Sequence, residues 1–106
     1  MAVKVYNKLV RDKIPEILES SGKMCETEIL SDERYLEMLE AKLLEECTEF
    51  QIDNDIEELV DIIEVIYAIA GARGVTEGEL DRIRVEKATK NGRFKEKIFL
   101  KEVTEW

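Results

Sequence analysis

Histidine is absent from this 106-residue sequence, and proline occurs once, glycine five times and cysteine twice. Two cysteines are too few for a disulfide scaffold, and without histidine they cannot complete a Cys/His zinc site. The scarcity of proline and glycine leaves little room for the turns of a β-sandwich. These absences favour an all-α fold with both thiols reduced, as expected in the cytoplasm.

Long hydrophobic runs are also lacking. Met1–Val10 contains no uninterrupted apolar segment like that of a signal peptide, and the apolar run at Ile62–Ala72 is too short to cross a bilayer. We therefore expect a cytoplasmic protein with no membrane partner. Its 106 residues suit a single domain, 1–106, whose core is small enough that oligomerisation is expected.

Lysine and arginine are missing between Leu43 and Ala72, a stretch that holds nine acidic residues and many aliphatic ones. The net charge of -9 arises entirely in this stretch, because the 16 acidic residues outside it equal the 16 bases of the chain. The acidic balance argues against non-specific nucleic-acid binding. Carboxylates that border a core without cationic partners repel one another and resist desolvation. A divalent metal ion is therefore the obvious candidate for the missing positive charge.

Start and stop signals along the chain predict four helices. The predicted helices run from Ile14 to Ser21, after Ser31 to Asp53, after Asp55 to Ala72, and after Thr76 to about Asn91. Short extended segments precede and follow them. The expected architecture is an all-α helical bundle of about four helices.

The third predicted helix is apolar on nearly all sides, and its one polar stripe is acidic. Such a helix lies at the centre of a fold, buried by its own chain and by another subunit. We therefore expect a homodimer or a homotetramer. On the preceding helix Glu46 and Glu49 flank the apolar stripe, whereas Glu45 falls on the far side and is expected to face solvent.

Two acidic pairs form the candidate metal site: Glu46-x-x-Glu49 and, after a helix break, Glu58-x-x-Asp61. Residues three apart share a helix face, so two antiparallel helices can bring the four carboxylates opposite one another. All-oxygen ligands suit Mg²⁺ or Mn²⁺, and Mg²⁺ usually binds together with substrate phosphates. One alternative is a solvated acidic face. An EF-hand loop is disfavoured, because Glu58 stands where that loop needs glycine.

The chain resembles the MazG-like and phosphoribosyl-ATP pyrophosphohydrolase-like proteins of the all-α nucleoside triphosphate pyrophosphatase superfamily. The resemblance covers about Tyr6 to Leu100 and rests on four segments: Asn7–Pro15, Lys42–Glu49, Glu57–Val65, and Lys87 with 91–94. It implies a Mg²⁺-dependent hydrolase that cleaves the α–β phosphate bond of a nucleoside triphosphate, giving a nucleoside monophosphate and pyrophosphate. Two departures are a shorter gap between the acidic pairs and the lack of histidine.

Matched position by position, the resemblance implies that Glu46, Glu49, Glu58 and Asp61 are metal ligands. Glu46 or Glu49 would also take the proton of the attacking water, although a lysine or a metal-bound water could do so. Basic residues would bind the phosphates as charge-assisted donors: Lys8, Arg11, Lys13, Lys87 and Arg93. A solvated basic face is the alternative for the first three. Tyr6 or Phe94 could stack on a base, with core packing the favoured alternative.

Three functions remain in competition on this basis. The first is removal of noncanonical or surplus nucleoside triphosphates. The second is hydrolysis of phosphoribosyl-ATP in histidine biosynthesis, which neighbouring histidine-pathway genes would favour. The third is a catalytically silent helical module that binds a nucleotide or a partner, because the presence of ligands does not prove turnover.

Overall fold

The computed structural model describes residues 2–106, and these contain four α-helices and no β-strand. The helices are α1 (Ile14–Ser20), α2 (Asp32–Asp53), α3 (Ile56–Ala72) and α4 (Glu77–Asn91). The predicted all-α class and the four helices are confirmed, with ends within one residue of those expected. The segments before α1 and after α4 contain no regular secondary structure.

The residues that the sequence predicts as helix N-caps form capping hydrogen bonds in the structure. The Ser31 hydroxyl accepts a hydrogen bond from the backbone N–H of Arg34 at 3.2 Å, which begins α2. The Asp55 carboxylate accepts one from the N–H of Glu57 at 3.0 Å, which begins α3. Each bond satisfies a backbone donor that the first helical turn leaves free. Asn54 ends α2 in a left-handed conformation, with φ 53°.

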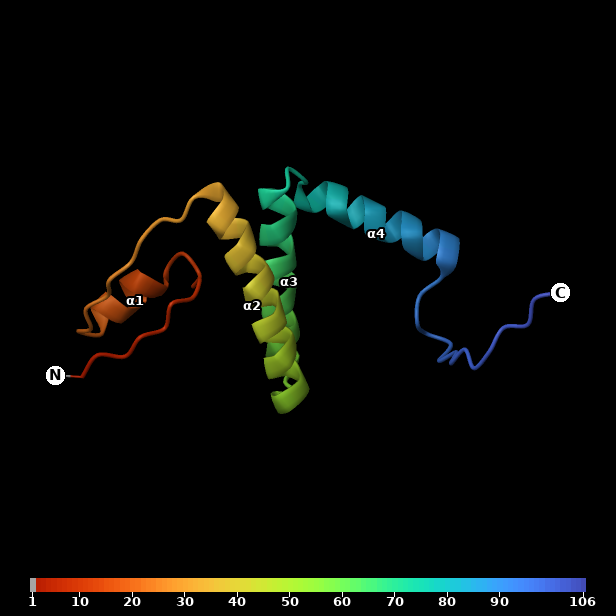
Figure 1. Ribbon diagram of the computed structural model, residues 1–106, viewed down its shortest axis with the longest axis horizontal. Helices are drawn as coiled ribbons and strands as arrows, with labels where there is room; N and C mark the ends of the chain where they lie inside the picture. The colour runs from red at the N-terminus through yellow and green to blue at the C-terminus, as the bar shows by residue number, and fades with distance from the viewer. Residues whose placement is uncertain (1) are drawn as a thin grey trace.

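Helices α2 and α3 form an antiparallel hairpin joined by only two residues, and this hairpin is the centre of the molecule (Figure 1). Its interface buries Leu39 of α2 together with Val65 and Ala70 of α3. Among the described residues Glu46 is the single buried charged residue, with 6% of its surface exposed. The hairpin therefore holds a small apolar core that has one acidic group inside it.

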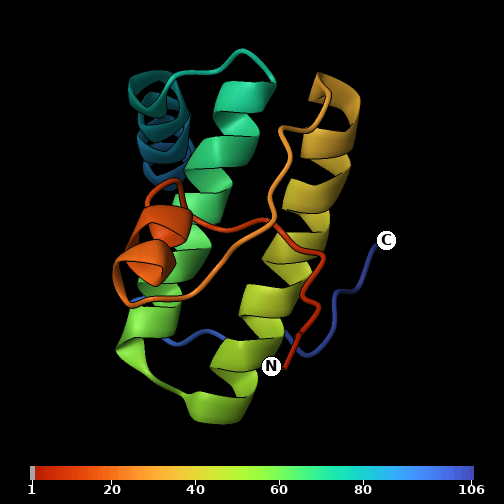
Figure 2. The ribbon, with the colours of Figure 1, turned by 90° about the vertical axis from the view of Figure 1, so that its left-hand side faces the viewer.

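The two remaining helices extend away from the hairpin on opposite sides (Figures 1 and 2). Within residues 2–106, α1 packs on no other helix, and α4 packs only on α3. The radius of gyration is 18.8 Å, whereas a compact chain of this length has one of about 13 Å. The isolated chain is thus an open hairpin with two arms.

Much apolar surface stays uncovered in this open shape. The exposed surface is 10117 Å², against about 6,100 Å² for a folded monomer of 12.3 kDa. Exposed side chains on α3 include Ile56, Val60 and Ile63, which the sequence pattern predicts to be buried. Across residues 2–106, each helix is too short or too polar to span a membrane.

Candidate functional site

A cluster of three carboxylates lies across the α2–α3 hairpin. One carboxylate oxygen from each of Glu46, Glu58 and Asp61 lies within 4.8 Å of the other two. Glu46 lies seven residues, about two turns, before the end of α2, and the other two come from the first two turns of α3. The short connection at Asn54 and Asp55 folds these turns against each other. The three residues are therefore neighbours because of local chain geometry.

Two oxygens of this cluster are buried and have no hydrogen-bond partner among the described residues: Oε2 of Glu46 and Oε2 of Glu58. Burial, together with the negative charges of Glu49, Asp53 and Asp61, raises the pKa of Glu58 to about 7. Buried polar atoms in proteins nearly always have a partner. An orphaned pair of acceptors beside a third carboxylate fits the oxygen ligand set that Mg²⁺ or Mn²⁺ prefers.

Glu49, the fourth predicted ligand, lies outside this group of three but close to it. It is half-buried one helical turn after Glu46. Burial raises the pKa of Glu49, and the charge of Glu46 adds to the effect. The predicted set is therefore partly assembled, with three carboxylates together and the fourth electrostatically coupled to them.

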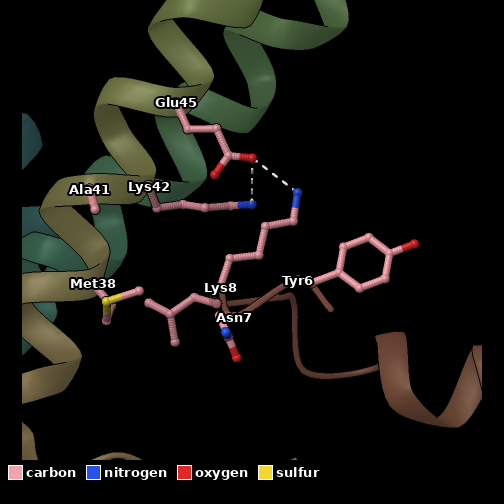
Figure 3. Close-up of a pocket in the computed structure, with 8 residues that line it drawn as sticks. Tyr6, Asn7, Lys8, Met38, Ala41, Lys42 and Glu45 are labelled. Atoms are coloured by element: carbon pink, nitrogen blue, oxygen red, sulfur yellow. Dashed lines mark hydrogen bonds and ion pairs between the residues drawn. The ribbon is translucent and has the colours of Figure 1, made fainter. Parts of the chain in front are cut away.

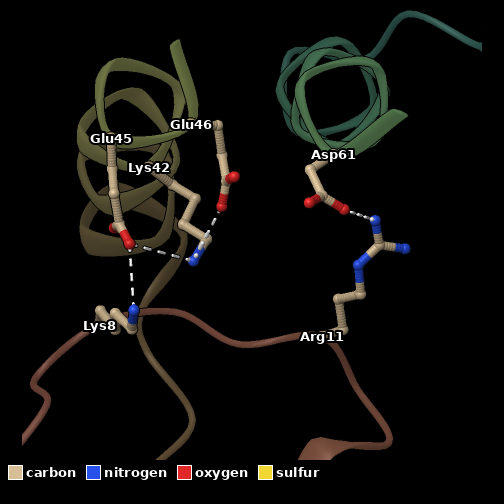
Figure 4. Close-up of polar contacts among 6 residues, drawn as sticks. All are labelled: Lys8, Arg11, Lys42, Glu45, Glu46 and Asp61. Carbon is tan, nitrogen blue, oxygen red and sulfur yellow. Dashed lines mark hydrogen bonds and ion pairs between the residues drawn. The ribbon is translucent and has the colours of Figure 1, made fainter. Parts of the chain in front are cut away.

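Bases of the N-terminal segment contact the same acidic region (Figure 4). The Nζ atom of Lys8 lies 3.0 Å from Oε1 of Glu45, and a guanidinium nitrogen of Arg11 lies 2.7 Å from Oδ1 of Asp61. The hydrogen bond from Lys8 lowers the pKa of Glu45 and raises that of Lys8. Residues 8 and 11 thus supply positive charge to a stretch that contains none of its own.

Lys42 is a site residue to which the sequence analysis assigned no role. Its Nζ lies 3.3 Å from Oε1 of Glu46 and 3.8 Å from Oε1 of Glu45. The signal was present in the sequence, because spacings of three and four place Lys42 beside both acids on α2. The expectation that Glu45 faces solvent was wrong. Glu45 is half-buried, since the N-terminal segment crosses that side of α2 and brings Lys8 to it.

The remaining predicted phosphate-binding residues lie away from the cluster. Lys13 is exposed at the start of α1, while Lys87 on α4 and Arg93 after it are exposed on the opposite arm. Within residues 2–106 these three form no ion pair with the carboxylates. A single chain therefore brings Lys8 and Arg11 to the acidic region, and leaves the other three apart.

A cavity of about 300 Å³ lies between the N-terminal segment and α2 (Figure 3). Its lining includes Tyr6, Lys8, Met38, Lys42 and Glu45. Tyr6 is 60% exposed, and the Nζ atoms of Lys4 and Lys8 lie 5.0 and 5.9 Å from the centre of its ring. The sequence analysis favoured core packing for Tyr6 and Phe94. Both residues are exposed in the single chain, so this expectation was wrong there.

Comparison with known proteins identifies a partial match. A stretch of 43 residues is 46% identical to part of an uncharacterized protein of Mycolicibacterium smegmatis. This match covers 41% of the present chain and 44% of that protein, so it spans less than half of the relative's length. Protein-family models and solved structures give no match. The family resemblance therefore stays a prediction.

Proposed function

We propose that this protein is a nucleotide pyrophosphohydrolase that depends on Mg²⁺, or on Mn²⁺ in its place, and cleaves the α–β phosphate bond of a nucleoside triphosphate. One observation carries the proposal. Two helices direct carboxylates into a common, partly buried position, where two carboxylate oxygens have no hydrogen-bond partner within residues 2–106. Desolvated carboxylates of this kind are costly unless a cation joins them.

In this proposal Glu46, Glu58 and Asp61 hold the metal ion, with Glu49 at the edge of the set. A bound divalent ion would neutralise phosphate oxygens and lower the pKa of a nearby water. Burial and the charge of Glu46 raise the pKa of Glu49, which makes its carboxylate a stronger base for the proton of the attacking water. Glu46, whose carboxylate is buried beside it, is the second candidate for this role.

The N-terminal bases have two successive partners in the proposed reaction. Lys8 and Arg11 neutralise Glu45 and Asp61 in the metal-free chain. When a cation takes over Asp61, Arg11 would be released to bind the phosphates of the substrate by charge-assisted hydrogen bonds. The same phosphates would compete for Lys8 with Glu45, which lies outside the proposed ligand set. Lys13, two residues after Arg11, would join them at the outer end of the triphosphate.

We further propose that the working unit is a homodimer or a homotetramer. The exposed surface exceeds that of a compact monomer by about 4,000 Å², which is in the range of obligate interfaces. Lys87 and Arg93 would then bind phosphates in the site of a neighbouring copy, because they lie far from the cluster in their own chain. Hydrolysis of phosphoribosyl-ATP stays an alternative within the same chemistry.

The test is pyrophosphate release across canonical nucleoside triphosphates, modified nucleoside triphosphates and phosphoribosyl-ATP, with and without Mg²⁺. Wild type should release pyrophosphate, and Glu49→Gln and Asp61→Asn should each lose at least about a hundred-fold, as expected when a ligand or base is removed. Glu40→Gln, which removes an exposed carboxylate of α2 outside the cluster, is the matched control. The preferred substrate would separate the two enzymatic alternatives.

A folded protein that releases no pyrophosphate from any of these substrates would contradict the proposal. A binding measurement distinguishes the remaining possibility. If a nucleoside triphosphate binds in the presence of Mg²⁺ without turnover, and Asp61→Asn abolishes the binding, the protein is a silent nucleotide-binding module.

A further inference from the structure

The charge of the chain is divided between two surfaces that do not meet. The hairpin stretch 43–72 has nine acidic residues and no base, whereas residues 82–101 have eight bases and two acids, a net charge of +6. We call residues 82–101 the basic arm. It consists of most of α4 and the segment that follows. Oppositely charged surfaces of this size attract strongly when they approach within a Debye length.

The basic arm finds no acidic partner on its own hairpin. Its ion pairs among residues 2–106 are local ones within α4, between Arg82 and Glu86 and between Arg84 and Asp81. The arm leads away from the hairpin (Figure 1). Its positive charge is therefore presented outward.

The direction of α4 is fixed by hydrogen bonds at its junction with α3. The N–H of Val75 donates to the carbonyl of Ala70 at 2.8 Å, and that of Gly74 donates to Gly71 at 3.0 Å. The Thr76 hydroxyl then caps α4 by accepting from the N–H of Glu79 at 3.1 Å. Folding α4 back along its own α3 would break this junction. The arm can reach an acidic face without such a change only on another molecule.

Apolar side chains accompany the charges on both surfaces. On the arm, Phe94 is 98% exposed, and Ile98 and Phe99 are almost as open. On the hairpin, Ile56, Val60 and Ile63 of α3 are exposed beside the acidic stripe of Glu57, Asp61 and Glu64. A contact between the two surfaces would bury apolar groups as well as pair charges, and interfaces need such a hydrophobic centre.

We propose that the basic arm of one copy lies along the acidic face of α3 in a second copy, and that this reciprocal exchange is the contact through which the chain self-associates. The inference rests on the proposed self-association and specifies its surfaces; it does not require hydrolysis. The contact would carry Lys87 and Arg93 toward the carboxylate cluster of the second copy. Each site is then completed by residues of both chains.

A charge-swap experiment tests the contact with two variants. The arm variant, Lys90→Glu with Lys95→Glu, changes the net charge of residues 90–95, the centre of the arm, from +3 to −1. The hairpin variant, Glu57→Lys with Glu64→Lys, changes the net charge of the stripe of Glu57, Asp61 and Glu64 from −3 to +1. None of these four residues belongs to the proposed catalytic or phosphate-binding set. Each variant alone faces like charges at both contacts and should self-associate at least about ten-fold more weakly than wild type. An equimolar mixture should form mixed oligomers, because both contacts are again complementary.

The matched control is Lys4→Glu with Lys23→Glu, which makes the same change in net charge at the N-terminal end. It should self-associate as wild type does, and circular dichroism should show all variants to be helical. Sedimentation velocity provides the masses. Monomeric wild type at all concentrations, or an arm variant that associates as well as the control, would overturn the proposal.

Zero-length cross-linking provides a second readout that is independent of activity. A carbodiimide joins a lysine amine to a neighbouring carboxylate, and mixing ¹⁵N-labelled with unlabelled wild type distinguishes links between copies from links within one. Peptides that join Lys87, Lys90 or Lys95 to Glu57 or Glu64 should contain one heavy and one light partner. Links between these positions within single chains only would overturn the proposal. Absence of pyrophosphate release would leave both readouts unchanged, so failure of the enzymatic proposal is recognised separately.

Discussion

At the scale of single residues, the carboxylates of the α2–α3 hairpin are paired with basic residues that lie outside the acidic stretch 43–72. Lys42 comes from the same helix as Glu46, while Arg11 comes from a segment fifty positions before Asp61. Glu58 has no such partner in the part of the chain that the structure describes, and its pKa is raised to about 7. The residues around the cluster therefore differ in how much each would gain from a bound cation.

Glu58 should make the stability of the metal-free protein depend on pH. Its folded pKa is about 7 and its ordinary value is 4.5, so the folded chain retains a proton that the unfolded chain loses in between. The free energy of unfolding should therefore decrease as pH rises from about 4.5 to about 7. Glu58→Gln should flatten this decrease. Urea unfolding with a chelator, at one protein concentration, measures it.

The control for this measurement is Glu19→Gln, which removes an exposed carboxylate of α1. It should keep the wild-type pH profile. Identical slopes in wild type and Glu58→Gln would show that Glu58 ionises normally in the folded chain.

Lys42 should matter most when no metal is present. Its replacement in Lys42→Met leaves the buried Glu46 carboxylate without its cation at 3.3 Å, and the free energy of unfolding should decrease by about 2 kcal/mol. Millimolar Mg²⁺ should recover most of the loss, because the ion would replace the missing charge. Lys23→Met is the control, because Lys23 is exposed and forms no ion pair with any described residue. An equal decrease in the free energy of unfolding with and without Mg²⁺ would argue against the interpretation that Lys42 and the metal ion bind the same Glu46 carboxylate.

At the scale of elements, the connection between α2 and α3 decides where the carboxylates meet. Asn54 has φ 53°, a conformation that disfavours side chains other than glycine, asparagine and aspartate. Asn54→Ala should therefore lower the free energy of unfolding by at least about 1 kcal/mol, and Asn54→Gly should change it by only a few tenths. Chemical denaturation measures both, with Asn91→Ala, in an ordinary helical position, as control. Equal effects of alanine and glycine would contradict this reasoning.

Much of this level of structure could be predicted from local sequence. Ser31, Asp55 and Thr76 each mark a helix start, because a cap is recognised from a few neighbouring residues. The meeting of Glu46 with Glu58 and Asp61 was equally predictable, since spacing and one short turn determine it. The path of the N-terminal segment could not be predicted in this way. Pairing of Arg11 with Asp61 depends on tertiary structure, and the resulting cover over Glu45 reversed a prediction made from the helical wheel.

At the scale of the whole molecule, the chain has too little core for its surface. Among residues 2–106 three hydrophobic residues are buried, namely Leu39, Val65 and Ala70. An apolar helix in the sequence can indicate that the core of one chain is too small to bury it. The sequence cannot indicate which other surface covers that helix. That information lies in the direction of α4, which the hydrogen bonds at the junction of α3 and α4 determine.

Stability should consequently depend on protein concentration. Association of folded chains stabilises them by mass action, so a hundred-fold increase in concentration should raise the unfolding temperature by several degrees. Ile63→Glu, which places a charge on the exposed apolar side of α3, should reduce this dependence. Differential scanning calorimetry from about 2 to 200 μM measures both. An unfolding temperature independent of concentration in wild type would indicate that the isolated chain is stable alone.

The short hairpin connection also fixes an order of events in time. Contacts between α2 and α3 are close in sequence, and such contacts form in microseconds to milliseconds, whereas subunit assembly takes milliseconds to minutes. A newly made chain therefore closes its acidic cluster before it meets another copy. During that interval its exposed apolar side chains can pair wrongly. The bases at Lys8 and Arg11, which are synthesised before the acids, are already present when the repulsive carboxylates come together.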